Sequence, residues 1–182
     1  MTAHAEAAIR LLLLTGLRRN EVTELRWRDL EHGSRETQLG GSQTRARVAP
    51  LSPEAARVLA GIPRVDGNPH VIPGKKPGTY LHNLNDAWDR IRKRAELEDV
   101  RLHDCRHSFA SRALALGEGL TMIGKLLGHT KVETTARYAH LARESVRDSA
   151  IRVSDSIAAD IFKGYPVGGR GRSPGQDGDL TP

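Results

Sequence analysis

The chain has 182 residues, a formal net charge of +6, a pI of about 9.9 and a single cysteine, Cys105. This length suffices for one domain with a buried core, followed by a tail. One cysteine excludes an internal disulfide framework and fits a reducing compartment, so we expect a cytoplasmic protein. The apolar run IRLLLL is far too short to cross a bilayer, and no secretory signal is visible, so no membrane association is expected. The positive charge favours a polyanionic partner only mildly.

The N-terminal half of the sequence predicts three helices and a hairpin. Residues 2–14 are rich in Ala and Leu and indicate a helix. A second helix is predicted to run from a cap at Asn20 through Trp27. The stretch RETQLGGSQTRARVAPL predicts two short strands around a glycine-containing turn. The stretch SPEAARVLA predicts a helix with Ser52 as its cap and Pro53 in its first turn.

The C-terminal half predicts a loop followed by helices. A segment rich in Pro and Gly covers residues 61–78 and includes one candidate short strand at Val71–Ile72. Helices are predicted for residues 80–95, 104–116, 119–127, 131–140 and 143–163. The last of these carries an apolar stripe that needs a surface to bury against: Val146, Ala150, Val153, Ile157 and Ile161. From Gly164 the composition changes to Gly, Pro, Ser, Arg and Asp, which predicts a disordered tail over 164–182.

Four short patches collect polar groups that suit chemistry on a phosphodiester. They hold Arg18 in TGLRRNE, His103 and Arg106 in LHDCRHSFASRA, His129 in LLGH, and Tyr138 in TTARYAHL. Residues three apart on a helix share a face, so His103 and Arg106 are expected to point the same way. Guanidinium groups bind phosphate oxygens bidentately and keep their charge at any working pH. Imidazoles supply hydrogen-bond donors or a proton acceptor, and a deprotonated tyrosine can attack phosphorus.

In these motifs, and in the hairpin ending RVAPLSP, the sequence resembles the catalytic domain of the tyrosine recombinases, the phage integrase family. The motifs TGLRRNE, HDCRHSFAS and LLGHTKVETTARYAHL run in the family's order and spacing across roughly residues 8 to 145. The resemblance implies an α+β, mainly helical fold with a small antiparallel sheet at one edge, in a catalytic domain over residues 1–163. It also implies site-specific DNA recombination or integration through a 3′-phosphotyrosyl intermediate, with no metal, cofactor or external energy source.

The resemblance assigns a role to each motif residue. Arg18 and Arg106 would clamp the scissile phosphate, and His103 would act in proton transfer. His129 would hydrogen-bond a phosphate oxygen, and Tyr138 would be the nucleophile. The partner would be double-stranded DNA, held by a homotetramer in which the C-terminal helix of each chain packs on a neighbouring protomer.

Two departures from the family pattern stand against full activity. The family's hairpin carries a lysine that protonates the leaving 5′ oxygen, whereas the first lysine of this chain is Lys75. Counting back from Arg47 puts that position at Gln43, with Ser42 as the other register, and glutamine is no useful general acid. The chain also begins almost at the first motif, so the start of the catalytic domain and the family's separate N-terminal core-binding domain are expected to be missing.

Other interpretations stay open. His103 and His107 have the spacing of a helical zinc site, although Asp104 is shorter than the usual Glu base, no third ligand is evident, and His107 also suits helix packing. A Cys105 nucleophile lacks a base and an orienting partner. A type IB topoisomerase would share the phosphotyrosyl chemistry, and the missing lysine favours a DNA-binding remnant with weak catalysis.

Overall fold

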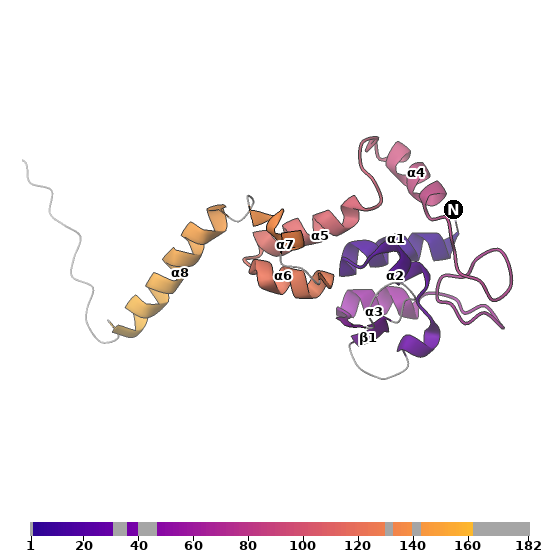
Figure 1. Ribbon diagram of the computed structural model, residues 1–182, viewed down its shortest axis with the longest axis horizontal. Coiled ribbons are helices and arrows are strands. Elements are labelled where there is room, and N and C mark those ends of the chain that lie inside the picture. Colours follow the sequence, from indigo (N-terminus) through magenta and orange to yellow (C-terminus); the bar gives the residue numbers. More distant parts are fainter. Residues whose placement is uncertain (1, 31–35, 40–46, 130–132, 140–142, 162–182) are drawn as a thin grey trace, which may run out of the picture. The chain divides into compact units, whose positions relative to one another are not determined.

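Figure 1 shows the computed structural model of the chain, which describes residues 2–30, 36–39, 47–129, 133–139 and 143–161. Its contacts divide the chain into two compact units, Met1–Ser145 and Val146–Pro182. Within the described ranges, no helix combines the length and the apolar character that crossing a membrane requires. The predicted disordered tail over 164–182 lies outside the described residues and stays a prediction.

Helix α1, Ala3–Thr15, is the centre of the first unit and confirms the first predicted helix. Thr2 caps it by accepting a hydrogen bond from the backbone N–H of Ala5 at 3.3 Å, and the chain leaves it through Gly16 with a φ of 64°. Most of its apolar side chains are buried. The helix contacts α2 (Arg19–Thr23), α3 (Pro53–Ala60), α4 (Asn85–Arg94) and α5 (Asp104–Ala115), which surround it in Figure 1.

The predicted second helix from Asn20 through Trp27 is wrong at both ends. Helix α2 is capped by Arg18, whose backbone N–H donates to Glu21 Oε2 at 2.8 Å. The carboxylate at the third helical position therefore reaches back to the residue before the helix, which is one half of a capping box. The helix stops at Thr23, and the 3₁₀ helix η1, Trp27–Leu30, follows as a separate element.

The predicted hairpin is confirmed as a two-stranded antiparallel sheet of β1, Glu36–Leu39, and β2, Arg47–Pro50. Glu36 pairs with Pro50, and Leu39 pairs with Arg47. Strand β1 also contacts η1, and the Thr37 side chain is fully buried. The structure is thus mainly helical with one small sheet, as the resemblance implied. The turn that holds Gln43 and Ser42 lies outside the described residues.

Helix α3 and the loop that follows it extend the core. Ser52 Oγ accepts from the Ala55 N–H at 3.2 Å and Pro53 is the first helical residue, which confirms the predicted start. Val71 and Ile72 are fully buried, but they lie between isolated bridges rather than in a strand of a sheet. These residues belong to the larger of two apolar clusters, which also includes the buried faces of α1, α3 and α4.

The smaller apolar cluster joins α5 to α6, Leu120–Leu127, and to the residues that follow α7, Glu133–Ala136. Its members are Ala110, Ala113, Leu114, Ile123, Leu127 and Tyr138. Helices α6 and α7 approach closely at Gly124, where a Cβ would lie 2.9 Å from Thr135 Oγ1. Helix α7 ends before residue 140, where the predicted helix over 131–140 was to end. Tyr138 lies in the turn that follows, and its N–H donates to Thr135 O at 3.0 Å.

The second unit contains most of α8, Arg143–Ile161, which confirms the predicted C-terminal helix as far as residue 161. Three apolar side chains of α8 are exposed: Ile151 by 50%, Val153 by 59% and Ile157 by 52%. The second unit by itself therefore leaves these side chains largely in contact with solvent.

Candidate functional site

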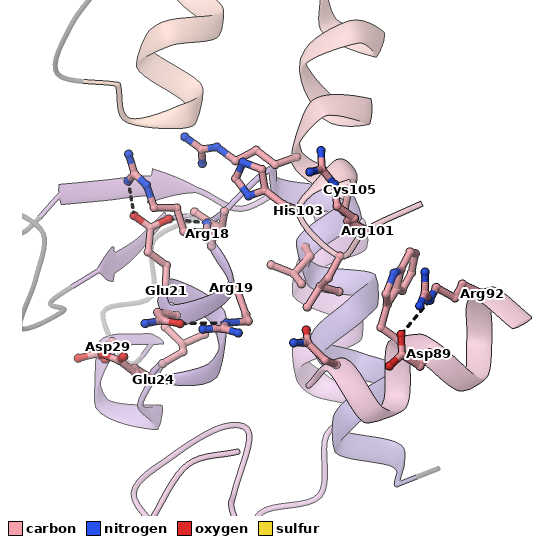
Figure 2. Close-up of a pocket in the computed structure, with 18 residues that line it drawn as sticks. Arg18, Arg19, Glu21, Glu24, Asp29, Asp89, Arg92, Arg101, His103 and Cys105 are labelled. Atoms are coloured by element: carbon pink, nitrogen blue, oxygen red, sulfur yellow. Dashed lines mark hydrogen bonds and ion pairs between the residues drawn. The ribbon is translucent and has the colours of Figure 1, made fainter. Parts of the chain in front are cut away.

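A cavity of about 680 Å³ lies between the start of α2, helix α4 and the start of α5. Figure 2 shows Arg18 and Glu21 on one side of it, Asp89 and Arg92 on the other, and His103 between them. Arginines and carboxylates both line the cavity, and two of them form the ion pair Arg92–Asp89 at 2.8 Å. In such a wall, the arginines can bind an anionic group, and the carboxylates disfavour orientations that bring its charge close to them.

Arg18 is held at the N-terminus of α2 by its capping partner. Its Nη1 lies 3.1 Å from Glu21 Oε1, and its Nη2 donates to the carbonyl of Gly128 at 3.3 Å. The Arg18 side chain is 37% exposed, whereas that of Glu21 is 5% exposed. The buried carboxylate therefore fixes a guanidinium that still faces the cavity.

Arg106 is far more enclosed, with 5% of its surface exposed. Its Nη1 donates to Gly16 O and its Nη2 to Leu127 O, both at 2.6 Å. These carbonyls lie at the C-terminal ends of α1 and α6, where the partial charge of a helix is negative and favours a cation. Arg18 and Arg106 therefore bind neighbouring carbonyls, those of Gly128 and Leu127, at the end of α6.

His129 follows the same helix end. Gly128 terminates α6 with a φ of 66°, and the His129 N–H donates back to Gly124 O at 2.9 Å. The His129 Nδ1 lies 2.8 Å from Thr135 Oγ1, which fixes the orientation of the ring. Three predicted site residues, Arg18, Arg106 and His129, thus come together around the C-terminal end of α6.

His103 occupies the N-cap position of α5 and lines the cavity together with Arg18 and Arg106. Its ring stands edge-on to that of His107, with the centroids 5.1 Å apart. Partial burial lowers the pKa of His103, and the nearby His107 and Arg106 lower it further. The imidazole is therefore neutral at pH 7 and available as a proton acceptor.

Tyr138 does not line this cavity. Its side chain is 5% exposed and packs in the smaller apolar cluster. Its hydroxyl lies 2.8 Å from His107 Nδ1, so it is linked to His103 through the His107 ring. Burial raises the pKa of the Tyr138 phenol, and this effect is opposed by the charges of Arg137 and Arg106. The hydroxyl is therefore protonated at neutral pH.

Of the other candidates, Gln43 lies outside the described residues, so its place at the leaving oxygen stays a prediction. Cys105 is 3% exposed, and burial raises the pKa of its thiol, which disfavours the nucleophilic thiolate. The described part of the chain holds no group of three or more His, Cys, Asp or Glu placed to bind a metal ion. The contact between His107 and Tyr138 was not predicted, although the spacing of His103 and His107 already put both rings on one face of α5.

Comparison with known proteins shows which family the chain belongs to. The sequence profile of the phage integrase family matches residues 1–145. The chain is 33% identical over 142 residues to the tyrosine recombinase XerC of Xanthomonas axonopodis pv. citri, which covers 74% of this chain and 46% of that protein. It is 29% identical over 169 residues to the integrase of Salmonella phage P22, which covers 84% of this chain and 43% of that protein.

A solved structure of the XerH site-specific recombinase, bound to difH substrate before cleavage, has a similar fold. The two structures match with a TM-score of 0.64 and 25% sequence identity, over 79% of this chain and 44% of XerH. The chain thus spans less than half the length of these three proteins. With its motifs in the expected order and the family profile covering residues 1–145, the chain belongs to the phage integrase family.

Proposed function

We propose that this chain cleaves and rejoins DNA strands at a specific site, with Tyr138 as the nucleophile of a 3′-phosphotyrosyl intermediate. The observation that carries the proposal is the convergence of Arg18, Arg106 and His129 at the C-terminal end of α6. Two guanidiniums beside an imidazole can stabilise the charge that builds on a phosphodiester during attack. Membership of the phage integrase family supports the same reaction.

Each candidate site residue has a separate role in the proposed reaction. Arg18, held by Glu21, and Arg106 clamp the non-bridging oxygens of the scissile phosphate, and His129 donates a further hydrogen bond. His103, with its lowered pKa, is neutral and takes part in proton transfer. Tyr138 is 5% exposed and does not line the cavity, so the proposed reaction includes a rearrangement that brings the phosphate and the hydroxyl together. In this rearrangement the hydroxyl stays within reach of His107 Nδ1, its partner in the structure.

Double-stranded DNA is the proposed partner. The net charge of +6 and the arginines of the cavity wall suit a polyanion, and the related XerH was solved in complex with its difH substrate. We further propose that chains assemble on DNA as a homotetramer through α8. Val153 and Ile157, four residues apart on that helix, supply an exposed apolar face that a neighbouring protomer would cover.

A DNA-binding remnant with weak catalysis is the second candidate, and Gln43 favours it. In the family's arrangement this residue faces the leaving 5′ oxygen, where glutamine can donate a hydrogen bond but cannot deliver a proton. A remnant of this kind would bind DNA and form little or no covalent product.

Covalent capture tests both candidates. The full chain is incubated with a pool of nicked duplexes whose flanks are randomised and whose central step carries a 5′-bridging phosphorothiolate. A thiolate leaves without needing an acid, so the missing lysine does not mask the nucleophile. We expect wild-type protein to form an adduct that survives denaturation, and Tyr138→Phe to form none while binding the selected duplex with similar affinity in a mobility-shift assay. An adduct in the Phe variant would disprove the assignment of Tyr138. An adduct with the phosphorothiolate, but little or none with the same duplex carrying an ordinary phosphate, would favour the remnant, because only the ordinary leaving group needs an acid.

A further inference from the structure

The environment of the Tyr138 hydroxyl points to a residue with a role of its own. The hydroxyl oxygen lies 2.8 Å from His107 Nδ1, a good distance for a hydrogen bond from an O–H to a ring nitrogen. The two rings are tilted by 57° with their centroids 5.8 Å apart. His107 is half-buried and Tyr138 is buried, so the contact is shielded from bulk water. His107 directly follows Arg106 in the sequence, so helix α5 carries both His107 and Arg106.

A buried phenol needs help to become a nucleophile. Burial raises the pKa of Tyr138 above a value that is already too high for ionisation at neutral pH. Arg106 and Arg137 cannot accept its proton, because a guanidinium stays charged. An imidazole nitrogen that carries no proton can accept it. His107 presents such a nitrogen to the oxygen that has to lose the proton.

The charged and titratable groups near His107 are Asp104, His103 and Arg106. Asp104 lies three residues before His107 on α5. A hydrogen bond from the Arg101 backbone chiefly lowers the pKa of Asp104, and the charge of His107 lowers it to a smaller degree. The Asp104 carboxylate therefore attracts an imidazolium at His107. The His103 ring, 5.1 Å away, is neutral at pH 7 and adds no opposing charge there. The positive charge of Arg106 disfavours an imidazolium at His107. The Arg106 guanidinium itself donates to the carbonyl oxygens of Gly16 and Leu127.

We propose that His107 is a catalytic residue, the base that takes the phenolic proton of Tyr138 during strand cleavage. The step rests on the proposed function. As the bond from the Tyr138 oxygen to phosphorus forms, the proton passes to His107 Nδ1. The bond from phosphorus to the 5′ oxygen breaks, and that oxygen keeps the electron pair and takes a proton from water. In rejoining, the 5′ hydroxyl attacks phosphorus and loses its proton to water, while His107 returns its proton to the departing tyrosine oxygen.

The test uses His107→Asn on the duplex selected by covalent capture. The asparagine amide can hydrogen-bond near the position of Nδ1 but cannot take up a proton, so positioning is kept and base catalysis is lost. His82→Asn serves as the matched control, because this exposed histidine lies outside the proposed site. We expect His107→Asn to slow single-turnover cleavage by about 100-fold or more, and His82→Asn to leave it within about twofold.

The leaving group and the pH dependence separate the possible roles of His107. A base for the nucleophile is needed whatever leaves, so the defect should be the same on the ordinary phosphate and on the 5′-bridging phosphorothiolate. The rate of the variant should rise about tenfold per pH unit between pH 7 and 9, as free phenolate becomes available, and the wild-type rate should depend less steeply on pH.

Two results would overturn the proposal. Rescue of His107→Asn by the phosphorothiolate would place His107 on the leaving-group side. A variant that keeps the wild-type pH profile, whatever its rate, would show that His107 only positions the tyrosine. Failure of the proposed function looks different, because then wild-type protein forms no adduct with either substrate, or Tyr138→Phe still forms one.

Discussion

Gly16 shows how closely the backbone is arranged around the Arg106 guanidinium. Its φ of 64° lies in the left-handed region, which suits glycine at the end of α1. A Cβ built at this position would lie 2.6 Å from Phe109 Cδ1 and 3.0 Å from Leu127 Cδ2. The carbonyl of the same residue accepts the hydrogen bond from Arg106 Nη1. A side chain at position 16 would therefore disturb both the packing of α5 and the proposed phosphate clamp.

We predict that Gly16→Ala destabilises the protein much more than Gly67→Ala. Gly67 has a similar φ of 73°, but a Cβ there would meet nothing within 4 Å, so alanine costs only the left-handed strain of about 1–2 kcal/mol. Gly16→Ala adds a clash with Phe109 and Leu127, typically worth another 1–3 kcal/mol. Urea denaturation of the two variants measures the difference. Equal losses would mean that the Phe109 ring moves aside freely.

Sequence motifs predict the candidate site residues but not their environments. Arg18, Arg106 and His129 stand in motifs that the chain shares with its family, and the structure brings all three to the end of α6. The burial of Arg106 depends on a carbonyl 90 residues away, which no local pattern contains. The burial of Tyr138 likewise depends on apolar side chains of α5 and α6. Motifs therefore predict which groups act, whereas tertiary packing decides which of them faces the cavity.

At the scale of elements, the ends of helices do most of the positioning. The loop before α4 attaches to the end of α2 through backbone bonds, with Trp27 N–H donating to Pro69 O at 3.0 Å and Val71 N–H donating to Leu25 O at 2.9 Å. His70 lies between them, 7% exposed, with its Nδ1 3.3 Å from Glu24 O. This attachment fixes the segment that leads from α2 to η1, which follows the residue pair Arg18–Glu21 in the sequence.

We predict that this attachment makes stability sensitive to acid. Burial lowers the pKa of His70, so the unfolded chain binds a proton more readily than the folded one. The contribution of His70 is fully present above the ordinary histidine pKa of about 6.5 and is lost as the pH falls below it, down to the folded pKa. The free energy of unfolding, measured in urea between pH 7.5 and 5, should therefore fall, and His70→Gln should reduce that fall.

His103 also has a lowered pKa and contributes with the same sign, so His103→Gln is the parallel control. The exposed ring of His103 is expected to contribute less than the buried His70. An unchanged slope in His70→Gln would show that the loop accommodates an imidazolium at no cost.

Elements with one clear local signal were predicted well, whereas competing local signals and distant contacts led to errors. The cap at Ser52 with Pro53 behind it predicted α3 correctly, because both signals act within one turn. The start of α2 was predicted two residues late, because Asn20 resembles a cap while Glu21 in fact bonds back to Arg18. Val71 and Ile72 look like a strand by composition, but the structure uses them as buried loop residues between isolated bridges.

For the whole molecule, the apolar side chains of α8 in the second unit suggest how chains assemble. Ile151, Val153 and Ile157 are each at least half exposed, which costs free energy in water. In the proposed assembly Val153 and Ile157, which share a face of α8, bury against a neighbouring protomer on DNA. Removing these apolar side chains from water would then contribute favourably to the free energy of oligomer formation.

We predict that Ile157→Asp weakens assembly on DNA without lowering the thermal stability of the monomer. Ile157 is 52% exposed in the chain, so little packing is lost on substitution. At a protomer contact, however, the variant forfeits the burial of an isoleucine side chain, about 1.5–3 kcal/mol, or roughly a ten- to hundredfold loss in association. Ser156→Asp adds the same charge one residue away on the exposed helix surface and is the matched control. Sedimentation velocity on the selected duplex should show Ser156→Asp assembling like wild type and Ile157→Asp remaining in smaller complexes. If the two variants assemble equally, the apolar side chains of α8 do not form the contact between protomers.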